Sequence, residues 1–170
     1  MLDQLKAHGY DVLSVGKIYD LFAGRGTTDH VLTSGNPDGI EKTIAWMERD
    51  FHGLCFTNLV DTDMIYGHRN DVDGYARAIS YFDAQLPRML ELLRDDDLLM
   101  VTADHGCDPV TPSTDHSREY IPWVITGKQV RAGADLGTLP TFADISATVL
   151  DYLGCEPLGV GTSRLSDILA

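Results

Sequence analysis

Carboxylate and imidazole side chains gather in three short stretches of the chain: Asp61–His68, Asp104-His105 and Asp115-His116. Each stretch lies beside an apolar run. The first follows residues 53–60, the second follows residues 98–101, and the third precedes residues 121–125. A strand that ends in a carboxylate and an imidazole is a common way for an α/β sheet to build a metal site.

Five of these side chains offer oxygen or nitrogen ligands, namely Asp63, His68, Asp104, His105 and His116. Such a set without thiolate suits Mn²⁺, Zn²⁺, Fe²⁺ or Mg²⁺. A structural zinc takes four ligands and prefers cysteine, so five are too many for it. The number suits two cations about 3.5–4 Å apart, which together clamp the oxygens of a phosphoryl transfer.

The alternative is that each Asp-His pair only caps a strand end through hydrogen bonds. Three such groups on one sheet edge favour the metal interpretation. Asp61 and Asp115 are interpreted as turn or supporting carboxylates rather than ligands. Cys107 is interpreted as structural, because these metals do not need a thiol.

Strand and helix patterns alternate along the chain. Apolar runs predict strands at residues 11–15, 53–60, 98–101 and 121–125, while a four-and-three apolar stripe predicts a helix from Tyr75 to Leu93. Pro87 is expected to kink or restart that helix. Asn36-Pro37-Asp38 is a helix start, and Thr141 caps a last helix that Gly154 ends.

This alternation predicts an α/β fold with a largely parallel sheet and helices on both faces. Ligands of such sheets collect at the carboxyl edge of the strands. The loop at Gly16-Lys17 and the polar stretches from Asp61 and from Asp104 all fall on that edge.

The 170 residues fit a single domain, residues 1–170. A net charge of -13 argues against nucleic acid as a partner. No apolar run reaches the roughly 18 residues of a membrane span. The three cysteines lack CxxC spacing, so reduced thiols in the cytoplasm are expected.

Three segments carry a resemblance to a known family: GKIYDLFAGRGTT, FTNLVDTDMIYGHRNDVDGYARAISYFDAQLP and TADHGCDPVTPSTDHSREYIPW. They resemble the bacterial phosphopentomutases of the alkaline phosphatase superfamily. The resemblance implies interconversion of ribose or deoxyribose 1-phosphate with the 5-phosphate, in nucleoside salvage. It also implies two Mn²⁺ ions and a phosphorylated threonine.

The same resemblance implies site roles. Asp63, His68 and His116 would hold one metal, Asp104 and His105 would contribute to the other, and Lys17 would contact the substrate phosphate. In that family the core begins with a strand that carries a further metal-binding aspartate, followed by the nucleophilic threonine and a cap domain. None of these is expected here, and no threonine of this chain matches the nucleophile position.

The chain is therefore expected to be the C-terminal part of an incomplete core, inactive by itself. Two other readings stay open. One is a minimal metal-dependent phosphatase or phosphodiesterase that uses water as the nucleophile. The other is a non-catalytic metal-binding module that completes its sheet by association with another chain.

Overall fold

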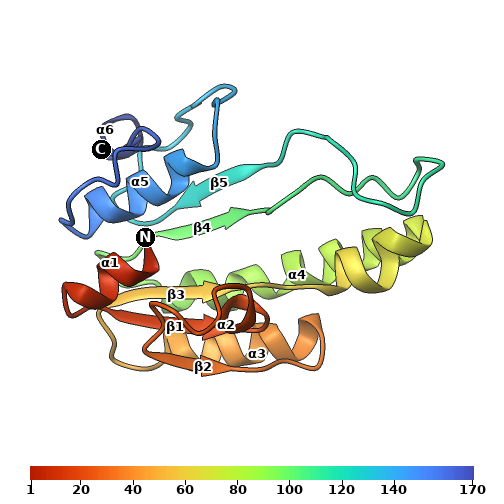
Figure 1. The fold of residues 1–170 in the computed structure, drawn as a ribbon, viewed down its shortest axis with the longest axis horizontal. Coiled ribbons are helices and arrows are strands. Elements are labelled where there is room, and N and C mark those ends of the chain that lie inside the picture. Colours follow the sequence, from red (N-terminus) through yellow and green to blue (C-terminus); the bar gives the residue numbers. More distant parts are fainter.

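A three-stranded parallel sheet forms one half of the molecule in the computed structural model, which describes residues 1–170 (Figure 1). Its strands are β1 (Asp11–Val15), β2 (Asp29–Val31) and β3 (Gly53–Thr57), in the order β2-β1-β3. The central strand pairs with both neighbours in parallel. Helix α3 (Asn36–Met47) connects β2 to β3, as a parallel crossover requires.

Helices cover both faces of this sheet. Alternate side chains of β1 point to opposite faces. Val12 packs with Leu2 and Leu5 of α1 (Leu2–Ala7) and with Leu150 of α5 (Ala143–Tyr152). On the other face, Leu13 and Val15 pack against Trp46 of α3. The predicted α/β architecture with helices on both faces is confirmed.

Helix α4 (Val72–Leu92) is the longest element, and it packs beside α3. Met89 contacts Ile40 and Ile44 there. The side chain of Asp71 accepts a hydrogen bond from Gly74 N–H, which starts the helix. The helix runs through Pro87 without a break, and so the predicted restart does not occur.

Strands β4 (Leu99–Thr102) and β5 (Trp123–Thr126) form a separate antiparallel pair. The sequence placed both strands in the right position but did not predict that they pair only with each other. In Figure 1 the arrows of β1, β3 and β4 point the same way, so the loops that follow them share one side of the molecule. This is the arrangement expected for Gly16-Lys17 and for the polar stretches that begin at Asp61 and at Asp104.

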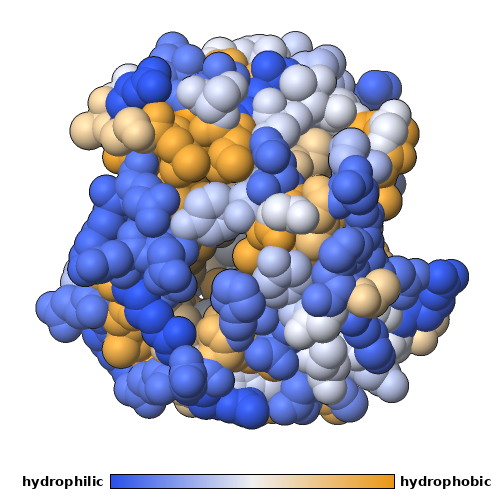
Figure 2. Space-filling model, turned by 90° about the vertical axis from the view of Figure 1, so that its left-hand side faces the viewer, coloured by the Kyte–Doolittle hydropathy of each residue, from blue (hydrophilic) through white to orange (hydrophobic).

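No strand hydrogen bonds join the two sheets. Each of β2, β3, β4 and β5 has one open edge, since β1 alone has a neighbour on both sides. A hollow opens near the middle of the face drawn in Figure 2, with hydrophobic side chains at its rim. Every residue of β3 is partly exposed, whereas four of the five residues of β1 are buried.

Five short elements were not predicted: β2, α2 (Ile18–Leu21), α6 (Leu165–Ile168), a π-helix at Thr62–Tyr66 and a 3₁₀ turn at Gly67–Arg69. The C-terminal tail docks through Ile168, which is buried, and through a bridge between Val130 and Leu169. No helix combines the length and the apolar character that a membrane crossing would need.

Candidate metal centre

A five-residue π-helix, η1 (Thr62–Tyr66), carries the first candidate ligand. It follows β3 at the carboxyl edge of the parallel sheet. Asp61 fixes its start, since Asn36 N–H donates to the Asp61 carboxylate at 2.7 Å and Asp61 N–H donates to Asn36 Oδ1 at 2.9 Å. Asp61 therefore supports a turn, as the sequence suggested. π-Helical turns are rare and often occur at functional sites.

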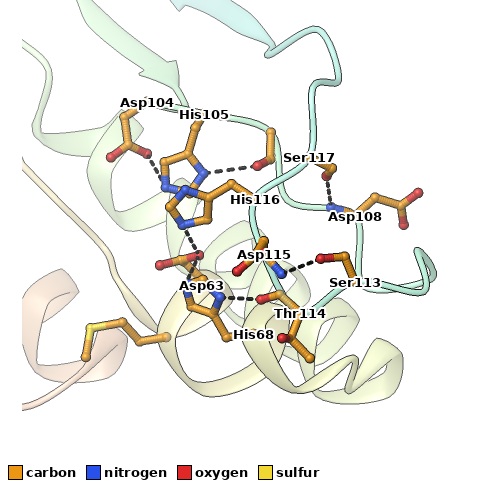
Figure 3. A network of polar contacts seen from close by, with 12 residues as sticks. Asp63, His68, Asp104, His105, Asp108, Ser113, Thr114, Asp115, His116 and Ser117 are labelled. Carbon is orange, nitrogen blue, oxygen red and sulfur yellow. Dashed lines mark hydrogen bonds and ion pairs between the residues drawn. The ribbon is translucent and has the colours of Figure 1, made fainter.

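Asp63, His68 and His116 converge on one point. The Nε2 atoms of His68 and His116 lie 3.3 Å and 3.2 Å from Asp63 Oδ1. The ligand atoms of the three residues all lie within 4.8 Å of one another. Two segments far apart in the sequence thus present one carboxylate and two imidazoles to the same small volume (Figure 3).

The hydrogen bonds around this cluster fit a cation. His68 Nδ1 lies 2.5 Å from the carbonyl oxygen of Thr114. A carbonyl only accepts, so the proton sits on Nδ1 and the lone pair of a neutral ring sits on Nε2. Asp63 Oδ1 is buried and has no hydrogen-bond donor. The Nε2 lone pair of a neutral His68 and the buried Asp63 oxygen repel each other unless a positive charge lies between them.

Asp104 and His105 follow β4 and extend the cluster. His105 Nε2 lies 3.7 Å from Asp104 Oδ1, and its Nδ1 lies 3.1 Å from Gly106 O. The His105 ring stacks on His116, with centroids 3.7 Å apart and planes 18° apart. Figure 3 shows His105, His116, Asp63 and His68 in one continuous row. The structure therefore brings all five predicted ligands into one neighbourhood, in which Asp63, His68 and His116 form the tighter group.

The loop that carries His116 runs through residues 106–117. An antiparallel bridge between Gly106 and Ser117 closes it at its neck. The Ser117 hydroxyl accepts a hydrogen bond from Asp108 N–H at 2.6 Å. The sequence analysis did not identify Asn70, which donates to carbonyl groups of this loop. Asn70 adopts a left-handed conformation, with φ of 51°, and asparagine is enriched at such positions. Its residue type was therefore the one signal in the sequence.

Lys17 lies beside the cluster, on the loop after β1. Its Nζ is 2.7 Å from Met64 Sδ, and Met64 follows Asp63 in η1. A thioether is a weak acceptor. The exposed ammonium group thus brings a positive charge close to an otherwise acidic edge, with hydrogen atoms free for another acceptor.

Cys107 packs against Gly67 near the cluster. Burial, and next the Asp63 carboxylate, raise the pKa of the Cys107 thiol above its usual value. Cys107 is also not among the residues whose ligand atoms converge on one point. This agrees with the structural interpretation of Cys107 and leaves an oxygen and nitrogen ligand set.

The fold and this ligand set define a class of protein. The family model described as Metalloenzyme superfamily matches residues 9–157, and the chain belongs to that superfamily. Within it, the similar curated proteins are phosphopentomutases. That of Lachnoclostridium phytofermentans is 57% identical over 169 residues, and that of Carboxydothermus hydrogenoformans is 55% identical over 168. The resemblance that the three motifs carry is confirmed.

Each of these comparisons covers 99% of this chain but 43% of the relative. The chain thus spans less than half the length of the curated relatives that it matches. Solved structures with the same fold are more distant in sequence. A phosphoglycerate mutase of Leishmania mexicana is 20% identical, with a TM-score of 0.76 over 99% of this chain and 39% of that protein. A Pyrococcus horikoshii protein is 16% identical, with a TM-score of 0.66 over 92% of this chain and 53% of that protein.

Proposed function

We propose that this chain is the metal-binding part of a phosphopentomutase, which interconverts ribose or deoxyribose 1-phosphate and the 5-phosphate in nucleoside salvage. The observation that carries the proposal is the 57% identity to a curated phosphopentomutase over 99% of the chain. The convergence of Asp63, His68 and His116 supports it independently, because phosphoryl transfer depends on stabilising negative charge on oxygen.

Two divalent cations are proposed, with Mn²⁺ favoured by carboxylate and imidazole ligands. Asp63, His68 and His116 would hold one, and Asp104 and His105 would contribute to the second. When bound, such cations neutralise the charge that develops on phosphoryl oxygens. The stacked His105 and His116 rings support a shared centre, because they fix the two ligand groups against each other.

Lys17 is proposed to bind the phosphate of the sugar substrate. Its ammonium group lies at the same sheet edge as Asp63 and makes its contact there with the weak acceptor Met64. An incoming phosphate oxygen is a far stronger acceptor for an ammonium group. In a chain with a net charge of -13, this local positive charge would favour an anionic ligand at the metal centre.

A further polypeptide segment is proposed to complete the sheet. The open edges of β3 and β4 carry unpaired backbone groups, which pair readily with another strand. The relatives are more than twice as long as this chain, so the additional segment and the nucleophile are proposed to belong to such a longer polypeptide. The three free cysteines support a reducing compartment, and we propose the cytoplasm.

The decisive experiment compares two preparations in the presence of Mn²⁺. One is the 170-residue chain alone, and the other is the chain joined to the unmatched part of the Lachnoclostridium phytofermentans relative. Conversion of ribose 1-phosphate to ribose 5-phosphate is measured for both. The joined protein should be active and the chain alone should not.

Asp63→Asn in the joined protein is the matched control and should abolish conversion. An inactive joined protein that folds and binds Mn²⁺ would contradict the proposed reaction. Mn²⁺-dependent hydrolysis of an aryl phosphate by the chain alone, lost in Asp104→Ala, would instead support a phosphatase that uses water.

A further inference from the structure

The 106–117 loop is held in the middle by one side chain from outside it. Asn70 Nδ2 lies 3.1 Å from Pro109 O, 2.8 Å from Thr111 O and 3.1 Å from Ser113 O. Its two N–H groups are thus shared among three carbonyl groups. Three alternate residues of the loop point their carbonyl oxygens at a single carboxamide.

The residues that follow these carbonyl groups are the ones that reach the metal cluster. Thr114 comes directly after Ser113, and its carbonyl oxygen accepts from His68 Nδ1. His116 follows two residues later and points its Nε2 at Asp63. The side chains of Ser113, Thr114 and His116 are all exposed, so burial of apolar groups does little to fix this part of the loop.

The backbone of Asn70 is adapted to this position. Its φ of 51° and ψ of 32° are left-handed, a region that asparagine tolerates better than most residues. The residue lies two positions after His68, between the 3₁₀ turn η2 (Gly67–Arg69) and the cap of α4. The same short segment therefore carries the candidate ligand His68 and the side chain that holds the loop of His116.

We propose that Asn70 is a positioning residue for the metal centre. Its carboxamide holds the 106–117 loop in the conformation that places Thr114 O against His68 Nδ1 and His116 Nε2 against Asp63. The inference rests on the proposed metal centre and adds a residue that would not touch the metal. Supporting residues of this kind typically change metal affinity by about 10–100-fold when they are replaced.

Two variants separate the side chain from the backbone. Asn70→Gly removes the carboxamide but accommodates a positive φ, whereas Asn70→Ala removes the carboxamide and strains the backbone. Gln129→Ala is the matched control, because Gln129 also donates a carboxamide hydrogen bond to a carbonyl group, that of Asp95, at 3.2 Å. Mn²⁺ affinity is measured by titration calorimetry, and stability is measured by denaturation in EDTA.

Both Asn70 variants should bind Mn²⁺ about 10–100-fold more weakly than the parent chain. Asn70→Ala alone should also be clearly less stable in EDTA, so affinity follows the carboxamide while stability follows the backbone. Hydrogen exchange in EDTA should become faster in residues 107–117 of Asn70→Gly and stay unchanged in β1. Gln129→Ala should change none of these values.

Mn²⁺ affinity of Asn70→Gly within twofold of the parent, in a chain where Asp63→Asn does weaken binding, would overturn the inference and leave the metal centre standing. Unchanged exchange in residues 107–117 would also overturn it. If the parent chain itself binds no Mn²⁺, the metal centre fails, and the role of Asn70 there fails with it.

Discussion

At the scale of single residues, the hydrogen bonds of His68 and Asp63 describe the candidate metal site better than the distances between the side chains do. Asp63 could have formed ordinary ion pairs with two protonated histidines. The Thr114 carbonyl engages His68 Nδ1 on the far side of the ring, and the nearest Asp63 oxygen is buried without a hydrogen-bond partner. A carbonyl group bonded to the far ring nitrogen is the usual support of a histidine that ligates a metal.

The first prediction concerns this carboxylate. Asp63→Asn should weaken Mn²⁺ binding by at least about 100-fold, because it removes the charged ligand, whereas changes to supporting residues alone cost about 10–100-fold. Titration calorimetry measures the effect. Asp83→Asn makes the same charge change at an exposed position within α4 and should stay near the parent value. Equal losses in both variants would mean that net charge, not coordination, controls binding.

The second prediction uses the close approach of Gly67 and Cys107. A methyl group at Gly67 would collide with Cys107 Sγ and come within 2.9 Å of Thr62 O. Gly67→Ala should therefore displace the 106–117 loop and weaken Mn²⁺ binding by about tenfold or more. Adding Cys107→Ala should recover part of the affinity, since it removes the sulfur. Failure of the double variant to recover would assign the loss to Thr62 instead.

At the scale of elements, one buried ion pair attaches the C-terminal tail to α5. Asp144 is 1% exposed and accepts from Arg164 Nη2 at 2.7 Å and from Thr162 N–H at 2.9 Å. The Arg164 guanidinium first, and the Thr162 amide next, hold the pKa of Asp144 below its usual value. The pair therefore stabilises the docked tail at neutral pH.

The third prediction follows from that pair. Asp144→Asn should lower the free energy of unfolding by about 3 kcal/mol, because Arg164 would keep a largely buried charge without its partner. A lowered folded-state pKa stabilises above the unfolded-state value and is lost as pH falls through the folded-state value. The gap between parent and variant should thus close below pH 3.8, the ordinary value for aspartate.

Urea denaturation across this pH range measures the effect. Asp151→Asn is the control, because Asp151 lies on the same helix but is exposed. Its effect should stay within about 0.5 kcal/mol. A gap between the parent chain and Asp144→Asn that does not shrink as pH falls below 3.8 would contradict the assignment to the Asp144 charge.

Elements with a strong pattern were predictable from sequence, and those fixed by distant contacts were not. The apolar run of β3 and the apolar stripe of α4 predict these elements from sequence alone. Strand β2 has three residues, none of them buried, and only its pairing with β1 defines it. The π-helix has no hydrophobic period of its own. The five candidate ligands could be chosen because their residue types are visible in the sequence, whereas the carbonyl groups that orient them are not.

At the scale of the whole molecule, metal binding should stabilise the fold. The candidate ligands come from both halves of the structure, and a site that exists only in the folded state stabilises it through mass action. The fourth prediction is that Mn²⁺ at about 100 times its dissociation constant adds about 2.7 kcal/mol. For a chain of this size the melting temperature should rise by roughly 5–10 °C.

Differential scanning fluorimetry measures this shift. EDTA should reverse it, and Asp63→Asn should lack it. A shift of the same size in Asp63→Asn would mean that Mn²⁺ stabilises the chain somewhere else.

Because β3 and β4 do not pair, a cation bound by the cluster would connect the two sheets to each other. Asp63 and His68 follow β3 of the parallel sheet, whereas His105 and His116 lie in the segment that connects the antiparallel strands β4 and β5. A cation bound by both groups would restrict the movement of the two sheets relative to each other, which no strand pairing does. Spin labels placed on β2 and β5 should report a narrow distance distribution with Mn²⁺ and a broader one after chelation, as the two halves gain freedom to hinge.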